Sequence, residues 1–146
     1  MKIVFCGSLN FYRQFDELAG RLGSMGFHEV YIPATARRII SGEVTLGQIN
    51  SEKAIGTFAE RTIRDDLIRK HWRAIRDGDA ILVVNGEKNG VAGYIGGNTF
   101  LEMGFAHVLD QKMFLLNSIP DMPSCRTEIE AFRPVVLDGD LGRLVV

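Results

Sequence analysis

The sequence predicts an α/β fold, a three-layer sandwich in which helices cover both faces of a five-stranded parallel sheet. Two observations carry this prediction. Five short apolar segments alternate with helix-like patterns along the chain, as expected when parallel strands are joined by helical crossovers. In addition, residues 79–85 read Asp-Ala-Ile-Leu-Val-Val-Asn, and a continuous apolar run of this kind is typical of a strand covered on both faces.

The first part of the chain predicts a strand, a helix and a second strand. Residues 2–7 form a short apolar run that ends at Gly7, and Ser8 or Asn10 would cap the helix that follows. The apolar residues of that helix recur on one face: Phe11, Phe15, Leu18, Leu22 and Met25. Residues 29–33 predict a second strand, closed by a proline that has no amide hydrogen for a ladder.

Residues 34–59 have a weaker pattern, which predicts an irregular insertion. Short helices over residues 36–40 and 48–55 fit the sequence, but serine and glycine residues interrupt any longer one. Because the segment exceeds the usual length of a connection, we expect a lid or a contact between subunits. The next predicted helix is the clearest one, over residues 61–77, with Gly78 as its stop.

The second half of the chain alternates strands and helices more regularly. A glycine-rich loop over residues 86–97 leads into a helix, and a strand over residues 112–117 follows. Four apolar side chains of this helix are expected to face the sheet: Leu101, Phe105, Val108 and Leu109. A short helix within residues 124–132 and a strand over residues 134–137 complete a flavodoxin/Rossmann-like sheet.

Composition narrows the class of protein. The 146 residues predict a single domain, residues 1–146, with ordinary shares of apolar (46%) and charged (24%) residues. A formal net charge of −1 argues against binding of nucleic acid polymers, which calls for a basic surface. No apolar run approaches the roughly 20 residues of a membrane span, and residues 1–7 are too short for a signal peptide. We therefore expect a cytoplasmic protein with two buried, reduced thiols, Cys6 and Cys125.

Small polar residues follow the carboxyl ends of three predicted strands, which is where ligands bind to parallel sheets. Asn117 and Ser118 follow one of them, and others lie beside the glycine-rich helix start. The candidate binding residues are Gly7, Ser8, Asn10, Asn85, Gly96, Gly97, Asn98 and Thr99. Free amides at a helix start, together with these side chains, predict a pocket that binds hydroxyls, a base or a phosphate.

Glu102 is the only carboxylate between residues 91 and 109, and two interpretations fit it. If Thr99 is the N-cap of the helix, Thr99 and Glu102 form a capping box and the carboxylate is structural. If Asn98 is the cap, the Glu102 side chain is free to point into a pocket, where a carboxylate can attack a glycosidic carbon. The spacing alone leaves both interpretations open.

No motif predicts a metal or an organic cofactor. The glycines of residues 86–97 match neither the dinucleotide fingerprint nor the P-loop. The histidines and cysteines show no metal-ligand spacing. His71 flanks the apolar face of its helix, where a surface or hydrogen-bonded histidine is the default.

The chain resembles the nucleoside 2-deoxyribosyltransferase-like family, most closely a subgroup without an assigned activity. Four segments carry the resemblance, in the same order over nearly the whole chain. They are residues 2–8 (Lys-Ile-Val-Phe-Cys-Gly-Ser), 79–84 (Asp-Ala-Ile-Leu-Val-Val), 96–106 (Gly-Gly-Asn-Thr-Phe-Leu-Glu-Met-Gly-Phe-Ala) and 112–116 (Lys-Met-Phe-Leu-Leu). The segment around Glu102 is the most specific of them.

The resemblance implies cleavage or exchange of the N-glycosidic bond of a nucleoside or nucleoside 5′-monophosphate by double displacement. Glu102 matches the family nucleophile, and water or a second base would resolve the glycosyl-enzyme. His71 stands where the family usually has an acid, and a histidine can act as general acid near neutral pH. The resemblance also implies a homodimer or higher homo-oligomer, and neither a metal nor an organic cofactor.

Two further interpretations remain open on the sequence alone. One is a non-catalytic α/β domain that binds or senses nucleotides. The other is a structural or assembly protein in which Glu102 only caps its helix. Among the catalytic interpretations, the serines and free amides at the strand ends favour hydrolysis of a nucleotide with a 5′-phosphate.

Overall fold

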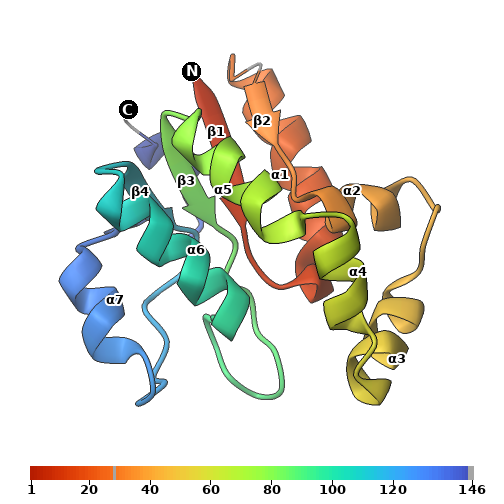
Figure 1. Cartoon of the computed structure of the whole chain (residues 1–146). Helices are drawn as coiled ribbons and strands as arrows, with labels where there is room; N and C mark the ends of the chain where they lie inside the picture. The colour runs from red at the N-terminus through yellow and green to blue at the C-terminus, as the bar shows by residue number, and fades with distance from the viewer. Residues whose placement is uncertain (28, 145–146) are drawn as a thin grey trace.

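The predicted strands pair in one parallel sheet in a computed structural model, which describes residues 1–27 and 29–144. They are β1 (Lys2–Cys6), β2 (Glu29–Tyr31), β3 (Ala80–Val83), β4 (Lys112–Leu115) and β5 (Val135–Val136). The order β2-β1-β3-β4-β5 confirms the predicted flavodoxin/Rossmann-like α/β fold (Figure 1). In this order the topological switch point, where ligands bind, lies between β1 and β3.

Helices cover both faces of the sheet (Figure 1). α1 (Tyr12–Ser24), which follows the short 3-10 helix η1 (Leu9–Phe11), packs on one face. The other face is covered by α5 (Leu67–Arg76), α6 (Gly97–Val108) and α7 (Arg126–Phe132). A second 3-10 helix, η2 (Leu141–Arg143), packs on the α1 side. The three-layer arrangement is therefore the predicted one.

Side chains of β1 alternate between the two faces, as a strand requires. Ile3 and Phe5 pack with α1, whereas Val4 and Cys6 pack with α5 and α6. This alternation puts the Cys6 thiol on the side of the helices that contain His71 and Glu102. Met25, predicted on the buried face of α1, instead caps the C-terminus of that helix and is 47% exposed.

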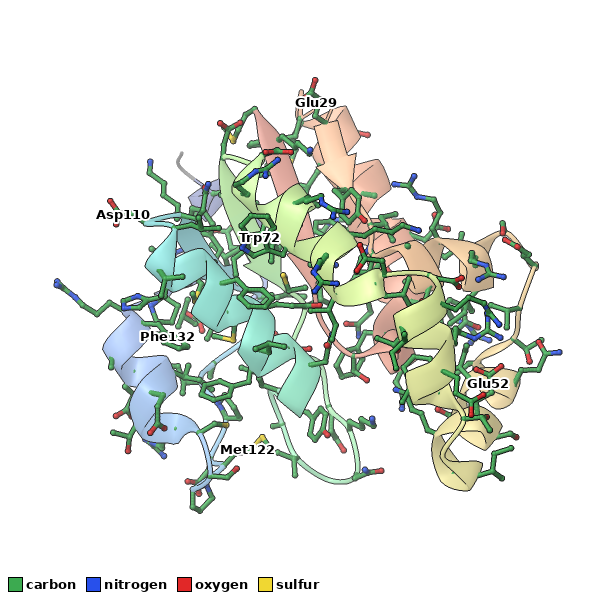
Figure 2. All side chains as sticks on the ribbon, in the orientation of Figure 1. Glu29, Glu52, Trp72, Asp110, Met122 and Phe132 are labelled. Atoms are coloured by element: carbon green, nitrogen blue, oxygen red, sulfur yellow. The ribbon has the colours of Figure 1, made fainter. Side chains whose placement is uncertain are left out.

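Residues 34–59, predicted to be irregular with two short helices at most, are largely helical, and both short helices are present. The segment holds α2 (Ala34–Ile40), α3 (Leu46–Ile55) and the start of α4 (Phe58–Arg64). A capping box between Thr45 and Gln48 begins α3. Glu52 of α3 accepts a hydrogen bond from Arg61 of α4 (2.7 Å), and Figure 2 shows it beside that helix. Three buried residues give the segment a small core of its own: Ile39, Val44 and Ile49.

The helix predicted over residues 61–77 is broken into α4 and α5. Asp66 adopts a left-handed conformation (φ 49°), and the break turns α4 away from the sheet. Ile63 of α4 is therefore 78% exposed, and Ile68 in the first turn of α5 is 45% exposed. Ala74 and Ile75 of α5 are buried in the core. No helix in the described part of the chain is long and apolar enough to cross a membrane.

The buried face of α6 differs from the predicted one. Leu101 and Val108, predicted to face the sheet, are 43% and 78% exposed, whereas Phe105 and Leu109 do pack against the core. The buried residues are Thr99, Glu102, Met103 and Ala106. Two of these four residues are polar. The prediction relied on the spacing of apolar residues, and it therefore chose a neighbouring face of the helix as the buried one. Polar residues on the inner face of a helix indicate a site.

Candidate active site

A pocket of about 240 Å³ opens beyond the carboxyl ends of β1 and β2. It is lined by the segment after β1, by the N-terminal half of α6, by α5 and by residues of α2, α3 and α4. Its volume lies just below the usual range for small-molecule sites, about 300–1,000 Å³. The pocket is therefore at the edge of the sheet where ligands bind in this fold, beside the switch point.

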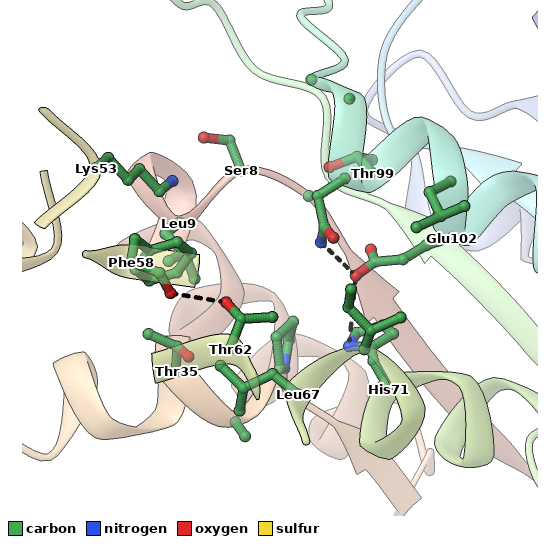
Figure 3. A pocket seen from close by; sticks show the side chains of 18 of the residues that line it. Ser8, Leu9, Thr35, Lys53, Phe58, Thr62, Leu67, His71, Thr99 and Glu102 are labelled. Carbon is green, nitrogen blue, oxygen red and sulfur yellow. Dashed lines mark hydrogen bonds and ion pairs between the residues drawn. The ribbon is translucent and has the colours of Figure 1, made fainter. Parts of the chain in front are cut away.

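Glu102 lies at one end of this pocket, on the second turn of α6 (Figure 3). Gly96 is the N-cap, and no side chain caps this helix, so the capping-box interpretation with Thr99 is wrong, as is the alternative cap at Asn98. Instead, Asn98 Nδ2 donates a hydrogen bond to Glu102 Oε1 at 2.8 Å. Glu102 is 6% exposed, and its Oε2 atom has no hydrogen-bond partner among the described residues.

His71 of α5 lies directly opposite Glu102. Its Nδ1 atom is 3.7 Å from Glu102 Oε1, and its Nε2 atom is 3.5 Å from Cys6 Sγ. Tyr31, at the end of β2, meets the imidazole edge to face at 5.6 Å between ring centroids. The imidazole is thus enclosed by β1, β2 and α6, which fixes its orientation.

Burial dominates the charge state of this group of side chains. It raises the pKa of Glu102 to about 8, against the nearby Cys6 thiol and the hydrogen bond from Asn98, which lower it. It lowers the pKa of His71 to about 4, against a hydrogen bond with the Phe5 backbone. At neutral pH the pocket therefore holds a neutral imidazole next to a largely protonated carboxyl group, and the two do not form an ion pair.

The opposite end of the pocket carries two lysines. Lys53 of α3 lies far from Glu102 across the pocket, on the side of Ser8 (Figure 3). Lys88, from the glycine-rich loop, places Nζ 3.4 Å from Ser8 Oγ. Desolvation, followed by repulsion from Lys88, lowers the pKa of Lys53. Neither ammonium group forms an ion pair with a carboxylate among the described residues. Two such cations beside a hydroxyl suit an anionic ligand group.

Most of the candidate residues predicted from the sequence meet at this pocket. Those that line it are Gly7, Ser8, His71, Gly96, Gly97, Asn98, Thr99 and Glu102. Gly7 is needed where the chain leaves β1, because a Cβ atom there would lie 2.7 Å from the Val84 carbonyl oxygen. Free amides at the start of α6 border the pocket, as predicted.

Two of the predicted binding residues lie elsewhere. Asn85 is fully buried, and its Nδ2 atom donates to the carbonyl oxygens of Asn117 (3.2 Å) and Ser118 (3.0 Å). Its Oδ1 atom accepts from the Asn117 amide at 2.8 Å, so this side chain ties two strand ends together and does not line the pocket. Asn10 is exposed in η1 and also lies outside the lining.

Sequence reasoning missed four residues of the site: Cys6, Tyr31, Lys53 and Lys88. Cys6 had a usable signal, since it precedes Gly7 at a strand end and alternation fixes its face. Lys88 lies in the glycine-rich loop, but a lone lysine in a loop is not a signal. Lys53 and Tyr31 come from segments whose position over the pocket depends on tertiary packing.

Comparison of the chain with protein-family models, with curated proteins and with solved structures found no match in any of the three. The site must therefore be interpreted from its own geometry.

Proposed function

We propose that this protein is an enzyme that cleaves the N-glycosidic bond of a nucleoside 5′-monophosphate or nucleoside, with Glu102 as nucleophile. One observation carries the proposal. The Glu102 side chain lines one end of the pocket, and its buried Oε2 atom has no hydrogen-bond partner among the described residues. A buried carboxyl group without a full set of hydrogen bonds contributes little to the stability of the fold. In its ionised form it can stabilise the cation-like carbon of a sugar.

The reaction follows from these positions in two displacements. Glu102 first loses its proton to solvent; its carboxylate then attacks the anomeric carbon, and the carbon–nitrogen bond breaks with its electron pair going to the base, which takes a proton from solvent. Water then attacks the resulting glycosyl ester, so that free sugar leaves and the carboxylate is restored; a second base in place of water would give exchange. Asn98 donates to Oε1 at 2.8 Å and so fixes the orientation of the carboxyl group.

His71 is better suited to positioning Glu102 than to donating a proton. A histidine whose pKa is about 4 is neutral at physiological pH, so the general-acid role predicted from the sequence is not favoured by its surroundings. The imidazole still confines the carboxyl group, 3.7 Å away. This leaves Glu102 as the residue that reacts.

The two lysines favour a nucleotide over a nucleoside. Lys53 lies across the pocket from Glu102, on the side of Ser8 (Figure 3), and Lys88 donates a hydrogen bond to Ser8. A phosphate ester would place its charge near these lysines while its sugar reaches the carboxylate. The preference for a phosphorylated substrate inferred from the strand ends is thus supported by residues that the sequence did not indicate.

A base-release assay tests this proposal. The protein is incubated with nucleosides and their 5′-monophosphates, with and without a second free base, and products are separated by chromatography. We expect base release that Glu102→Gln abolishes, while Glu128→Gln, an exposed acid on α7, leaves it unchanged. Turnover by Glu102→Gln at the wild-type rate would show that Glu102 is not the nucleophile.

A second function, a non-catalytic nucleotide-binding or sensing domain, is favoured by one observation. The buried Glu102 carboxyl group is largely protonated at neutral pH, and in that state it binds ligands as a hydrogen-bond donor and does not attack them. Stabilisation of the protein by nucleotides in a thermal-shift measurement, without base release over hours, would favour this function over the enzyme.

A further inference from the structure

Cys6, His71 and Glu102 form a buried cluster of metal-ligating side chains at one end of the pocket. The glycosidic mechanism uses Glu102 but gives Cys6 no function. One ligand atom from each residue lies within 4.8 Å of the other two, and all three residues are buried. They come from β1, α5 and α6, which pack against each other, so the fold and not a flexible loop brings the three donors together.

We propose that these three residues bind one Zn²⁺ ion, with the fourth coordination position open to the pocket. In a tetrahedral zinc site with bonds of about 2.0–2.3 Å, neighbouring ligand atoms lie roughly 3.3–3.8 Å apart. The His71 imidazole lies between the other two residues, with Nε2 3.5 Å from Cys6 Sγ and Nδ1 3.7 Å from Glu102 Oε1, so only one of these two distances can belong to the metal site. One imidazole nitrogen would serve as ligand, and the three ligand atoms, which lie within 4.8 Å of one another, would move closer together by about 1 Å.

The donor types select the ion. A thiolate, an imidazole and a carboxylate suit Zn²⁺, whereas Mg²⁺ and Ca²⁺ require oxygen ligands and would leave the sulfur unused. Three protein ligands with one open position are also the usual composition of a zinc site that exchanges its fourth ligand. The opening lies on the pocket side, since His71 and Glu102 both line it.

Charge balance supports a divalent ion at this place. Binding would release the thiol proton of Cys6 and the carboxyl proton of Glu102 to solvent, and the two resulting negative charges neutralise the ion in a buried setting. Zinc would also give Glu102 a partner in addition to Asn98, which donates to Oε1 at 2.8 Å and would orient the carboxylate from outside the metal shell.

The zinc site is proposed independently of the glycosidic function, although both proposals use Glu102. If Glu102 is the nucleophile, a bound zinc ion occupies it and turns the enzyme off. Metal binding is measurable without any substrate, so failure of one proposal does not decide the other.

Metal titration of the protein, stripped of metal with a chelator, provides the test. We expect one Zn²⁺ per chain in competition with a chromophoric chelator. Co²⁺ is expected to give a thiolate-to-metal charge-transfer band, and Mg²⁺ no response. Cys6→Ser should remove the band and weaken zinc binding by about 100-fold, because a neutral hydroxyl replaces a thiolate ligand. Cys125→Ser, which alters the other buried thiol, should bind as wild type does.

Thermal unfolding with and without zinc keeps the test decisive if a variant is unstable. Zinc is expected to raise the Tm of the wild type and of Cys125→Ser but not of Cys6→Ser, and the unfolding transition itself shows that the variant folds. Absence of zinc binding at micromolar concentration in the wild type would overturn the proposal. So would undiminished binding by Cys6→Ser, or loss of the cobalt band in Cys125→Ser.

Discussion

Glu102 combines two features that a structural residue would avoid. Its carboxyl group is buried, and one of its oxygens has no hydrogen-bond partner among the described residues. A buried group that is left unsatisfied costs folding free energy, about 1–3 kcal/mol. The sequence could single out Glu102, because it is the only acid in an apolar stretch, but it could not decide between a cap and a pocket residue. That decision needed the position of the helix start at Gly97.

The stability of the protein is predicted to fall between pH 6.5 and 8, and Glu102→Gln to remove this fall. The pKa of Glu102 is raised to about 8 in the fold, so above pH 4.5 the unfolded chain loses a proton that the folded protein keeps, and stability decreases with rising pH. The pKa of His71 is lowered to about 4, which has the opposite effect, but only below pH 6.5. The loss from pH 6.5 to 8 therefore belongs to Glu102 and amounts to about 2 kcal/mol.

Denaturant unfolding at both pH values, with a chelator present, measures this difference. Glu128→Gln serves as the control, because that glutamate is exposed and should leave the pH dependence of the wild type intact. An equal loss of stability in Glu102→Gln would mean that another group titrates in this window.

At the scale of the element, the strands were predicted well and the helical faces less so. Central strands are covered on both sides, so their apolar runs stand out in the sequence. In α6 two polar residues, Thr99 and Glu102, occupy the buried face, and apolar periodicity could not include them. The break between α4 and α5 at Asp66 was missed for a different reason: no glycine or proline marks it, and a left-handed aspartate is set by its surroundings.

The turn after β1 is predicted to require glycine. In Gly7→Ala the new Cβ atom would lie 2.7 Å from the Val84 carbonyl oxygen and 3.1 Å from the Phe15 ring, so strand β3 or helix α1 must move. We expect a loss of about 1–3 kcal/mol in the free energy of unfolding. Gly20→Ala is the matched control, because nothing lies within 4 Å of that position in α1. It should stabilise by about 0.5–1 kcal/mol. Equal effects of the two substitutions on urea unfolding would contradict the packing seen at Gly7.

At the scale of the whole molecule, the two ends of the pocket were predictable to different degrees. Glu102, Ser8 and the glycines after Tyr94 lie at strand ends and helix starts, whose positions follow from the fold class. Lys53 comes from α3, inside the segment predicted to be irregular, and reaches the pocket only because α2, α3 and α4 fold over it. The expectation that this segment forms a lid is consistent with its place in the lining.

The lysine pair is predicted to favour phosphorylated substrates. Lys53→Met and Lys88→Met each remove one positive charge from the end of the pocket opposite Glu102 and keep most of the side-chain volume. Each variant should lower the ratio of kcat/KM for a nucleoside 5′-monophosphate to kcat/KM for the nucleoside by about tenfold, because a charged hydrogen bond is lost. Lys70→Met, an exposed lysine on α5, should not change the ratio. An unchanged ratio in both pocket variants would place the phosphate elsewhere.

The measurement that tests the central claim most directly is mass spectrometry of the protein after reaction with a 2-fluoro-substituted substrate analogue. Fluorine at C2 destabilises the cation-like transition states, so a glycosyl-enzyme intermediate accumulates when its hydrolysis becomes slow. We predict that the intact protein gains the mass of one glycosyl group, that the peptide containing Glu102 carries it, and that Glu102→Gln gains none. Base release with no covalent adduct, or an adduct on another residue, would contradict the assignment of Glu102 as the nucleophile.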